Sequence, residues 1–110
     1  MSAAIKVLEK DIEKKIVAYA KSKGCLCYKF TSPAQRSVPD RIIVTPHGVV
    51  GFLEVKRPGN EPTKAQYAEL HKLLNLSCFA EWHDTVEGAK KFIDDLIKVR
   101  LNTWQEEPFV

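Results

Sequence analysis

Two short motifs in this chain carry residue types suited to phosphate chemistry: Pro39-Asp40 and, further along, Glu54-Val55-Lys56. Carboxylate oxygens are the ligands that Mg²⁺ and Mn²⁺ prefer, so Asp40 and Glu54 are suited to hold one of these ions together. A lysine beside such an ion can orient or deprotonate a water molecule and neutralise charge that develops on a phosphate. The two motifs therefore contain the side chains that a metal-dependent phosphodiesterase needs, and they predict this activity.

The segments that contain these motifs predict a β-hairpin. Residues 41–45 and 49–55 are apolar and typical of strands, and the turn residues 46–48 lie between them. In an antiparallel pair, the start of the first strand lies beside the end of the second. Counting outward from the turn, we expect Asp40 and Glu54 to lie at nearly the same height.

Each motif alone has an ordinary explanation, because Pro-Asp is common in turns and Glu-x-Lys on a strand usually faces solvent. The strand before Lys56 is otherwise apolar, however, which is not typical of a solvated face. Glu54 and Lys56 are two residues apart and leave the strand on the same face, whereas Val55 points into the core and keeps its backbone carbonyl free. The occurrence of both motifs on one hairpin favours a functional site.

The rest of the chain predicts a mixed α/β fold with the element order α-β-β-β-α-β-α. Apolar periodicity predicts three helices and two further strands: helices over residues 3–23, 63–74 and 85–101, and strands over residues 25–31 and 78–82. Polar segments 32–38 and 57–62 separate these elements. We expect a sheet of about four strands with helices on both faces and a right-handed crossover from residue 49 to residue 82.

Composition narrows the class of protein. The 110 residues suit one domain over residues 1–110, and a hydrophobic content of 45% allows a compact core. Three cysteines, an odd number, argue against a disulfide framework. No apolar run approaches the roughly 18 residues that span a bilayer, and the N-terminus lacks a signal-peptide core. We therefore expect an intracellular protein, in the cytoplasm or nucleoid of a bacterial or viral system. The net charge of +3 permits a phosphate-binding surface without requiring one.

The motifs resemble those of the PD-(D/E)XK nuclease superfamily, and within it the virus-type replication-repair nuclease (VRR-NUC) domain. More distantly, the chain is similar to archaeal Holliday junction resolvases. The resemblance runs from about Glu9 to Val86, and its motifs occur in order: Glu9 or Glu13, Gly24, Pro39-Asp40, Glu54-Val55-Lys56, Arg57-Pro58-Gly59 and Thr63-Lys64-Ala65-Gln66. The chain departs from the pattern at Asn75-Leu76-Ser77, which replaces the glycine usual before the next strand. The resemblance implies a three-layer core like that of restriction endonucleases.

The resemblance also implies a role for each matched residue. Asp40 and Glu54 would bind the divalent metal, with the Val55 carbonyl as a third ligand, and Lys56 would position water or stabilise the pentavalent phosphate. A glutamate of the first helix would complete the metal ligands; Glu13 is favoured and Glu9 is the alternative. Further candidates are Gln66 for catalysis and a group of residues for DNA contacts, namely Ser32, Arg36, Arg57 and Lys64.

Some of these residues have ordinary alternatives. Glu13 could pair on the helix surface with Lys10 or Lys14, because residues three or four apart on a helix are neighbours. Gln66 could be an ordinary helix surface residue. A glutamine near a helix N-terminus is nevertheless well placed to meet a phosphate, since that end of a helix attracts anions.

What the resemblance implies is a Mg²⁺- or Mn²⁺-dependent DNA endonuclease that leaves 5′-phosphate and 3′-hydroxyl ends. Branched DNA is the expected substrate, with four-way (Holliday) junctions leading, and no membrane or nucleotide cofactor is expected. A four-way junction needs two matched cuts, which favours a C2 homodimer. The apolar tail could form part of that interface or fold over its own core; its residues are Leu101, Trp104, Phe109 and Val110. The alternatives are a restriction-like or nicking endonuclease on linear duplex DNA, and a DNA-binding domain without catalysis.

Overall fold

The computed structural model describes residues 8–100. Its elements follow the predicted order: α1 (Glu9–Ser22), β1 (Leu26–Lys29), β2 (Arg41–Val44), β3 (Val50–Val55), α2 (Lys64–Asn75), β4 (Phe79–His83) and α3 (Val86–Lys98). Within residues 8–100, no helix is both long enough and apolar enough to cross a membrane.

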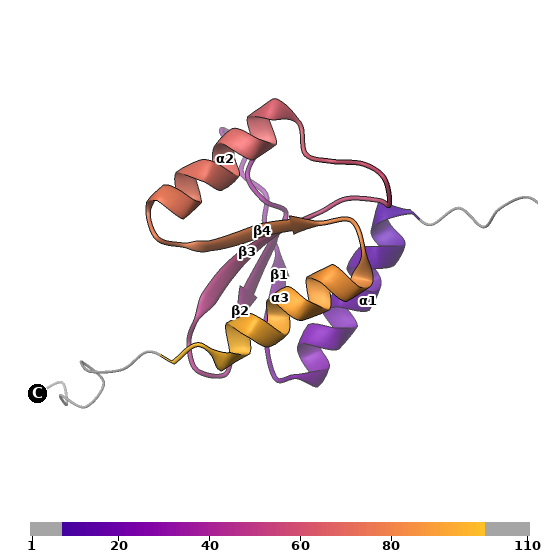
Figure 1. Cartoon of the computed structure of the whole chain (residues 1–110), viewed down its shortest axis with the longest axis vertical. Coiled ribbons are helices and arrows are strands. Elements are labelled where there is room, and N and C mark those ends of the chain that lie inside the picture. Colours follow the sequence, from indigo (N-terminus) through magenta and orange to yellow (C-terminus); the bar gives the residue numbers. More distant parts are fainter. Residues whose placement is uncertain (1–7, 101–110) are drawn as a thin grey trace, which may run out of the picture.

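The four strands form one mixed sheet in the order β1-β2-β3-β4. Neighbouring strands β1, β2 and β3 run antiparallel, and β4 runs parallel to β3. Helices α1 and α3 pack together on one face of the sheet, and α2 lies on the other (Figure 1). The structure therefore confirms the predicted α/β class, with three layers and helices on both faces.

The main core lies between the sheet and the pair α1 and α3. Its residues come from both helices and from the central strands, and include Ile12, Ile16, Ile43, Leu53, Val55, Phe92, Ile93 and Leu96. Gly51 allows β3 to pack closely against α3, because a Cβ atom there would lie 2.6 Å from Leu96 Cδ2 and 3.0 Å from Phe92 Cζ. This close packing fixes the height of β3 against α3, and with it the position of the residues at the end of β3.

The hairpin between β2 and β3 closes as the sequence predicts. The Thr45 N–H donates to the Val49 carbonyl, and the Gly48 N–H donates to the Thr45 carbonyl, both at 2.9 Å. The Thr45 hydroxyl also accepts from the Val49 N–H at 3.1 Å. Gly48 has φ of 81°, a left-handed conformation that glycine adopts without steric cost. The turn thereby sets the strand register on which the carboxylates depend.

Most predicted boundaries lie within two residues of the observed ones, and only the start of the first helix and the end of the last helix differ by more. The first helix begins at Glu9, because Leu8 is extended with φ of −97° and ψ of 156°; the predicted helical residues 3–7 lie outside the described residues. The first strand ends at Lys29 and not at residue 31. The last helix ends at Lys98, because Val99 is extended, and the apolar tail that begins at Leu101 lies outside the described residues.

At the end of α2, Ser77 occupies the position where a glycine is expected. Ser77 occupies the left-handed region with φ of 65°, which the structure shows for no other non-glycine residue among those described. The Ser77 N–H donates to the Leu74 carbonyl and the Cys78 N–H to the Leu73 carbonyl, both at 2.9 Å. These bonds close the helix as a glycine C-cap would, but the serine Cβ is strained in this conformation.

We therefore expect Ser77→Gly to stabilise the protein by about 1 kcal/mol, because glycine removes this strain. The thermal midpoint should rise by roughly 4–8 °C, a shift typical of that energy in a small domain. A matched control is Ser22→Gly at the last residue of α1, where glycine should destabilise by up to about 1 kcal/mol. Thermal unfolding followed by circular dichroism measures both, and a lower midpoint for Ser77→Gly would contradict the assignment of strain.

Candidate active site

A pocket of about 540 Å³ opens where β2 begins and β3 ends. Charged or amide-bearing residues that the motifs single out line it from four places in the fold. Glu9 begins α1, Asp40 precedes β2, Glu54 and Lys56 lie at the end of β3, and Gln66 lies in the first turn of α2. The fold thus gathers residues from both helical layers and the sheet into one cavity.

The sheet register places the two principal carboxylates level with each other. Arg41 pairs with Leu53, and continuing this register by one residue sets Asp40 beside Glu54. The Asp40 Oδ1 atom accepts from the Val55 N–H at 3.2 Å, which ties the start of β2 to the end of β3. The register thus agrees with the prediction that Asp40 and Glu54 lie side by side at the end of the hairpin away from its turn.

Glu54 has two side-chain partners on the side of α2. Its Oε2 atom lies 3.6 Å from Lys56 Nζ and accepts a hydrogen bond from Gln66 Nε2 at 3.2 Å. The residue is buried at 4% exposure, so these contacts fix the direction of a side chain that water hardly reaches. Lys56 stays partly exposed and faces the same pocket.

Gln66 belongs to the capping box that begins α2. Its backbone N–H donates to Thr63 Oγ1 at 3.2 Å, and its side-chain Oε1 accepts from the Thr63 N–H at 2.9 Å. The amide nitrogen of the same side chain donates to Glu54. A single glutamine therefore fixes the start of the helix and the orientation of a buried carboxylate.

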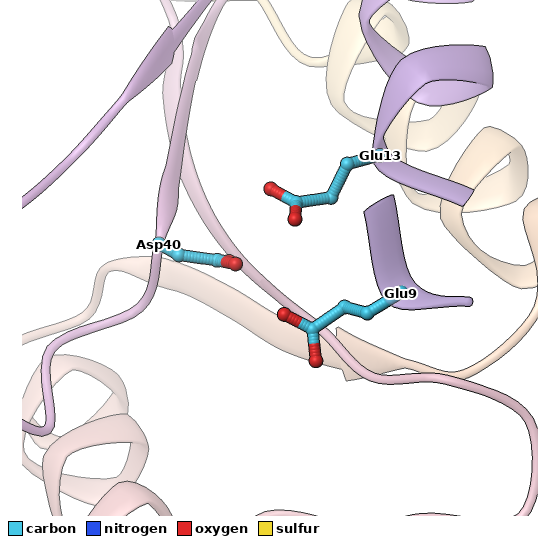
Figure 2. A group of neighbouring side chains, drawn as sticks. All are labelled: Glu9, Glu13 and Asp40. Carbon is cyan, nitrogen blue, oxygen red and sulfur yellow. The ribbon is translucent and has the colours of Figure 1, made fainter. Parts of the chain in front are cut away.

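The other carboxylates of the site come from α1. Figure 2 shows Glu9 and Glu13 reaching from the helix toward Asp40, and one carboxylate oxygen from each of the three lies within 4.8 Å of the others. Glu13 Oε1 also accepts from Arg41 Nε at 3.0 Å, in a partly buried ion pair. Glu9 lines the pocket, whereas Glu13 is held by Arg41 beside it.

Burial and the neighbouring negative charges raise the pKa values of Asp40 and Glu54. Burial, followed by the nearby Glu13 carboxylate, raises the pKa of Asp40 from 3.8 to about 6. Burial and the charge of Asp40 raise the pKa of Glu54 from 4.5 to about 7, although Lys56 acts in the opposite direction. A divalent cation among these oxygens would relieve both effects, so the donor set fits Mg²⁺ or Mn²⁺.

The remaining candidates lie at different distances from the pocket. Ser32 and Arg36 line it from the polar loop, while Arg57 and Lys64 are exposed and outside its lining. The Val55 side chain is fully buried, as predicted for its inward face.

Sequence reasoning missed several contacts that shape the site. It did not foresee the ion pair of Arg41 with Glu13, nor the hydrogen bond from Gln35 Nε2 to Glu69 Oε1 that ties the polar loop to α2. It also did not foresee that Phe30 lines the pocket. The only signal for Arg41 was its position directly after Pro39-Asp40.

Comparison with known proteins decides the family. A phage protein named "Putative nuclease p44", from Acyrthosiphon pisum secondary endosymbiont phage 1, is 41% identical over 70 residues, which are 64% of this chain and 75% of the phage protein. The chain belongs to the VRR-NUC nuclease family. A solved structure named "VRR_NUC domain" matches the fold with a TM-score of 0.72 at 22% identity, covering 78% of this chain and 94% of the other. A second, "VRR_NUC domain protein", matches with a TM-score of 0.65 at 21% identity, covering 84% and 90%. No family model matches the chain.

In the metal-free VRR-NUC domain, Asp40→Asn should raise the thermal midpoint at pH 8. The folded-state pKa of Asp40 lies above its unfolded value, so folding favours the protonated carboxyl, and stability falls as pH rises from about 4 through about 6. The amide removes the charge and keeps the oxygen that accepts from Val55. After allowance for solvent screening, we expect a gain on the order of 1 kcal/mol, or roughly 4–8 °C.

Calorimetry in the presence of a chelator measures this gain, which should shrink as the pH falls toward 4. Asp95→Asn is the matched control, because Asp95 pairs with Lys91 at 2.7 Å and its pKa is lowered by that lysine. This control should give no rise in the thermal midpoint at pH 8, because the amide only removes an exposed ion pair. An equal gain for Asp40→Asn at all pH values would show that charge is not the cause.

Gln66→Ala should impair both stability and cleavage, because it removes one bond of the helix cap and the donor to Glu54. We expect a loss of about 1 kcal/mol in unfolding free energy and about a ten-fold lower kcat. Thr63→Ala is the control, since it removes the other half of the capping box and leaves the bond between Gln66 and Glu54. If both variants lose stability and neither loses activity, Gln66 serves only the helix.

Proposed function

We propose that this VRR-NUC domain is a Mg²⁺- or Mn²⁺-dependent endonuclease that hydrolyses DNA phosphodiester bonds to 5′-phosphate and 3′-hydroxyl ends. The observation that carries the proposal is the pairing of Asp40 and Glu54 at one height in a pocket that also contains Lys56. Membership of the VRR-NUC family and the name of the phage relative support a nuclease.

The residues that would hold the ion are Asp40, Glu54 and the backbone carbonyl of Val55, with a glutamate of α1. The bound ion would supply Lewis acidity and lower the pKa of a water molecule. Between the two helix glutamates, we infer that Glu9 is better placed to bind the ion directly, because it lines the pocket. The charge of Glu13 is already compensated by Arg41 at 3.0 Å.

Lys56 has the geometry to act on the reacting phosphate. It lines the pocket, its ammonium lies 3.6 Å from Glu54 Oε2, and its side chain remains partly exposed. It would orient the attacking water and stabilise the additional negative charge of the pentavalent phosphate. The water oxygen bonds to phosphorus, the bond from phosphorus to the 3′-oxygen breaks, and that oxygen leaves as a hydroxyl after protonation.

For the substrate we propose branched DNA, with four-way junctions first. The polar loop contributes Ser32 and Arg36 to the pocket wall, where they would contact the backbone phosphates next to the scissile bond. The two-fold symmetry of a junction would be matched by a C2 homodimer. The alternative is cutting of linear duplex DNA, in which case the same loop would read bases.

A cleavage panel tests the proposal. Purified protein is incubated with a four-way junction, a flap, a fork and a linear duplex of matched sequence, with Mg²⁺, Mn²⁺ or a chelator. We expect cleavage that needs the metal and falls at least about 100-fold in Asp40→Asn and in Lys56→Ala. Lys91→Ala is the control, because this exposed lysine lies on α3 and pairs only with Asp95 among the described residues.

Cleavage that survives in Asp40→Asn and Lys56→Ala together would refute the site. Metal-dependent binding of every DNA without cutting would favour a domain that has lost catalysis. Light scattering on the same preparation tests the dimer against the monomer mass of 12.5 kDa. Faster cutting of the linear duplex than of the branched DNAs would favour the restriction-like alternative.

A further inference from the structure

Helix α2 covers only part of its face of the sheet. It packs against β4, while several apolar side chains of β1 and β3 on the same face remain exposed. Leu26 is 49% exposed, Tyr28 58% and Val50 41%. Part of this sheet face is therefore an uncovered apolar surface.

The strand register places an aromatic part of this surface next to the carboxylates. Tyr28 pairs with Ile42, which pairs with Phe52, so these three side chains lie in one row across the sheet. The next row, two residues further along the strands, contains Asp40 and Glu54 and lies about 7 Å away. The aromatic surface and the candidate active site are neighbours on the same face.

Phe30 connects the two rows. Its backbone N–H donates to the Asp40 carbonyl at 2.8 Å, which places it beside Asp40 at the edge of the sheet. Its ring lines the pocket, and the ring centroid lies 6.4 Å from that of Phe52 with an interplanar angle of 49°. Tyr28, Phe30 and Phe52 together form what we call the aromatic shelf, and Phe30 is its member that lines the pocket.

We propose that the aromatic shelf stacks an unpaired nucleobase of the DNA strand that is cut, next to the scissile phosphate. The proposal rests on the proposed function, because it assigns the substrate of the same site. Aromatic side chains stack on any base, so they bind single-stranded nucleic acid without a sequence preference. Tyr28 is the principal stacking residue, since its ring is the most exposed of the shelf.

The position of the shelf decides between a base and a protein partner. One sugar separates a base from its phosphate, which suits an aromatic row directly beside the row of carboxylates. A second copy of the chain seated on the shelf would cover the side of the pocket that Phe30 lines. Arg36 and Lys56 lie at the same pocket and are suited to bind the flanking phosphates.

The shelf also narrows the class of substrate. Inside a duplex, both faces of a base are covered by its stacked neighbours, so a ring can stack only on a base that has left the helix. Unpaired bases occur at forks, flaps and opened junction centres. The shelf therefore favours DNA in which the nucleotide at the cut is unpaired, and it disfavours a continuous duplex.

Two measurements test the shelf on the full chain. The first is binding of a fork with 2-aminopurine as the unpaired base at the cut site, in Ca²⁺ to prevent cleavage; stacking quenches its fluorescence. The second is the ratio of kcat/KM for the fork to that for a duplex of identical sequence, in Mg²⁺. We expect Tyr28→Ala to abolish the quench and to lower the ratio about ten-fold. Tyr28→Phe should keep both, because phenylalanine retains the ring.

Leu26→Ala is the matched control, because Leu26 lies on the same strand and face but one row further from the carboxylates. It should change neither the quench nor the ratio. A Tyr28→Ala protein that binds the fork with the full quench, or loses activity equally on fork and duplex, would overturn the proposal. A change in oligomeric mass in Tyr28→Ala would also overturn it, since the shelf would then be a protein interface. A wild type that quenches but does not cut would instead count against the proposed nuclease function alone.

Discussion

The gathering of four carboxylates at one partly buried end of the hairpin is the constraint on which this structure depends. The hairpin sets Asp40 and Glu54 side by side, and α1 adds Glu9 and Glu13. Lys56 and Arg41 each form an ion pair with one of these glutamates. Burial, with the repulsion of neighbouring carboxylates added to it, raises the pKa values of Asp40 and Glu54, which shows that their charged forms are unfavourable here. In the proposed metal-bound state a divalent cation would offset this cost, because it would neutralise the charge of the group.

The rest of the fold holds these repelling groups in place. The close contact of Gly51 with Leu96 fixes β3 against α3, and the hydrogen bond from Val55 to Asp40 fixes the start of β2 against the end of β3. Gln66 adds a link from the sheet to α2 on the opposite face. Each link is local and modest, but together they connect all three layers to the two carboxylates. The site is therefore as rigid as the core beneath it.

The sequence was sufficient to predict the hairpin and the pairing of its carboxylates, because turn residues and strand alternation determine register over a short distance. It did not predict the ion pair between Glu13 and Arg41, which lie 28 residues apart and meet only after α1 packs on the sheet. The pattern of strand β1 showed alternation, but not which face a helix would leave open. Nor did it show that Ser77 would adopt the glycine conformation, since side-chain size alone does not reveal the backbone angle that a turn imposes. Features set by neighbouring residues could be predicted from the sequence, whereas the part of the sheet that the helices cover could not.

The unequal coverage of the sheet follows from the connectivity of the chain. The single helix between β3 and β4 packs against β4, whereas α1 and α3 together cover the opposite face. The strand ends that carry Asp40 and Glu54 must stay accessible to a bulky polymer, and a helix long enough to shield β1 and β2 would obstruct that approach. An apolar surface left open in this way raises the risk of association, which selection tolerates where the surface binds something. Access to the carboxylates and exposure of the aromatic residues beside them thus both follow from the partial coverage of this sheet face by α2.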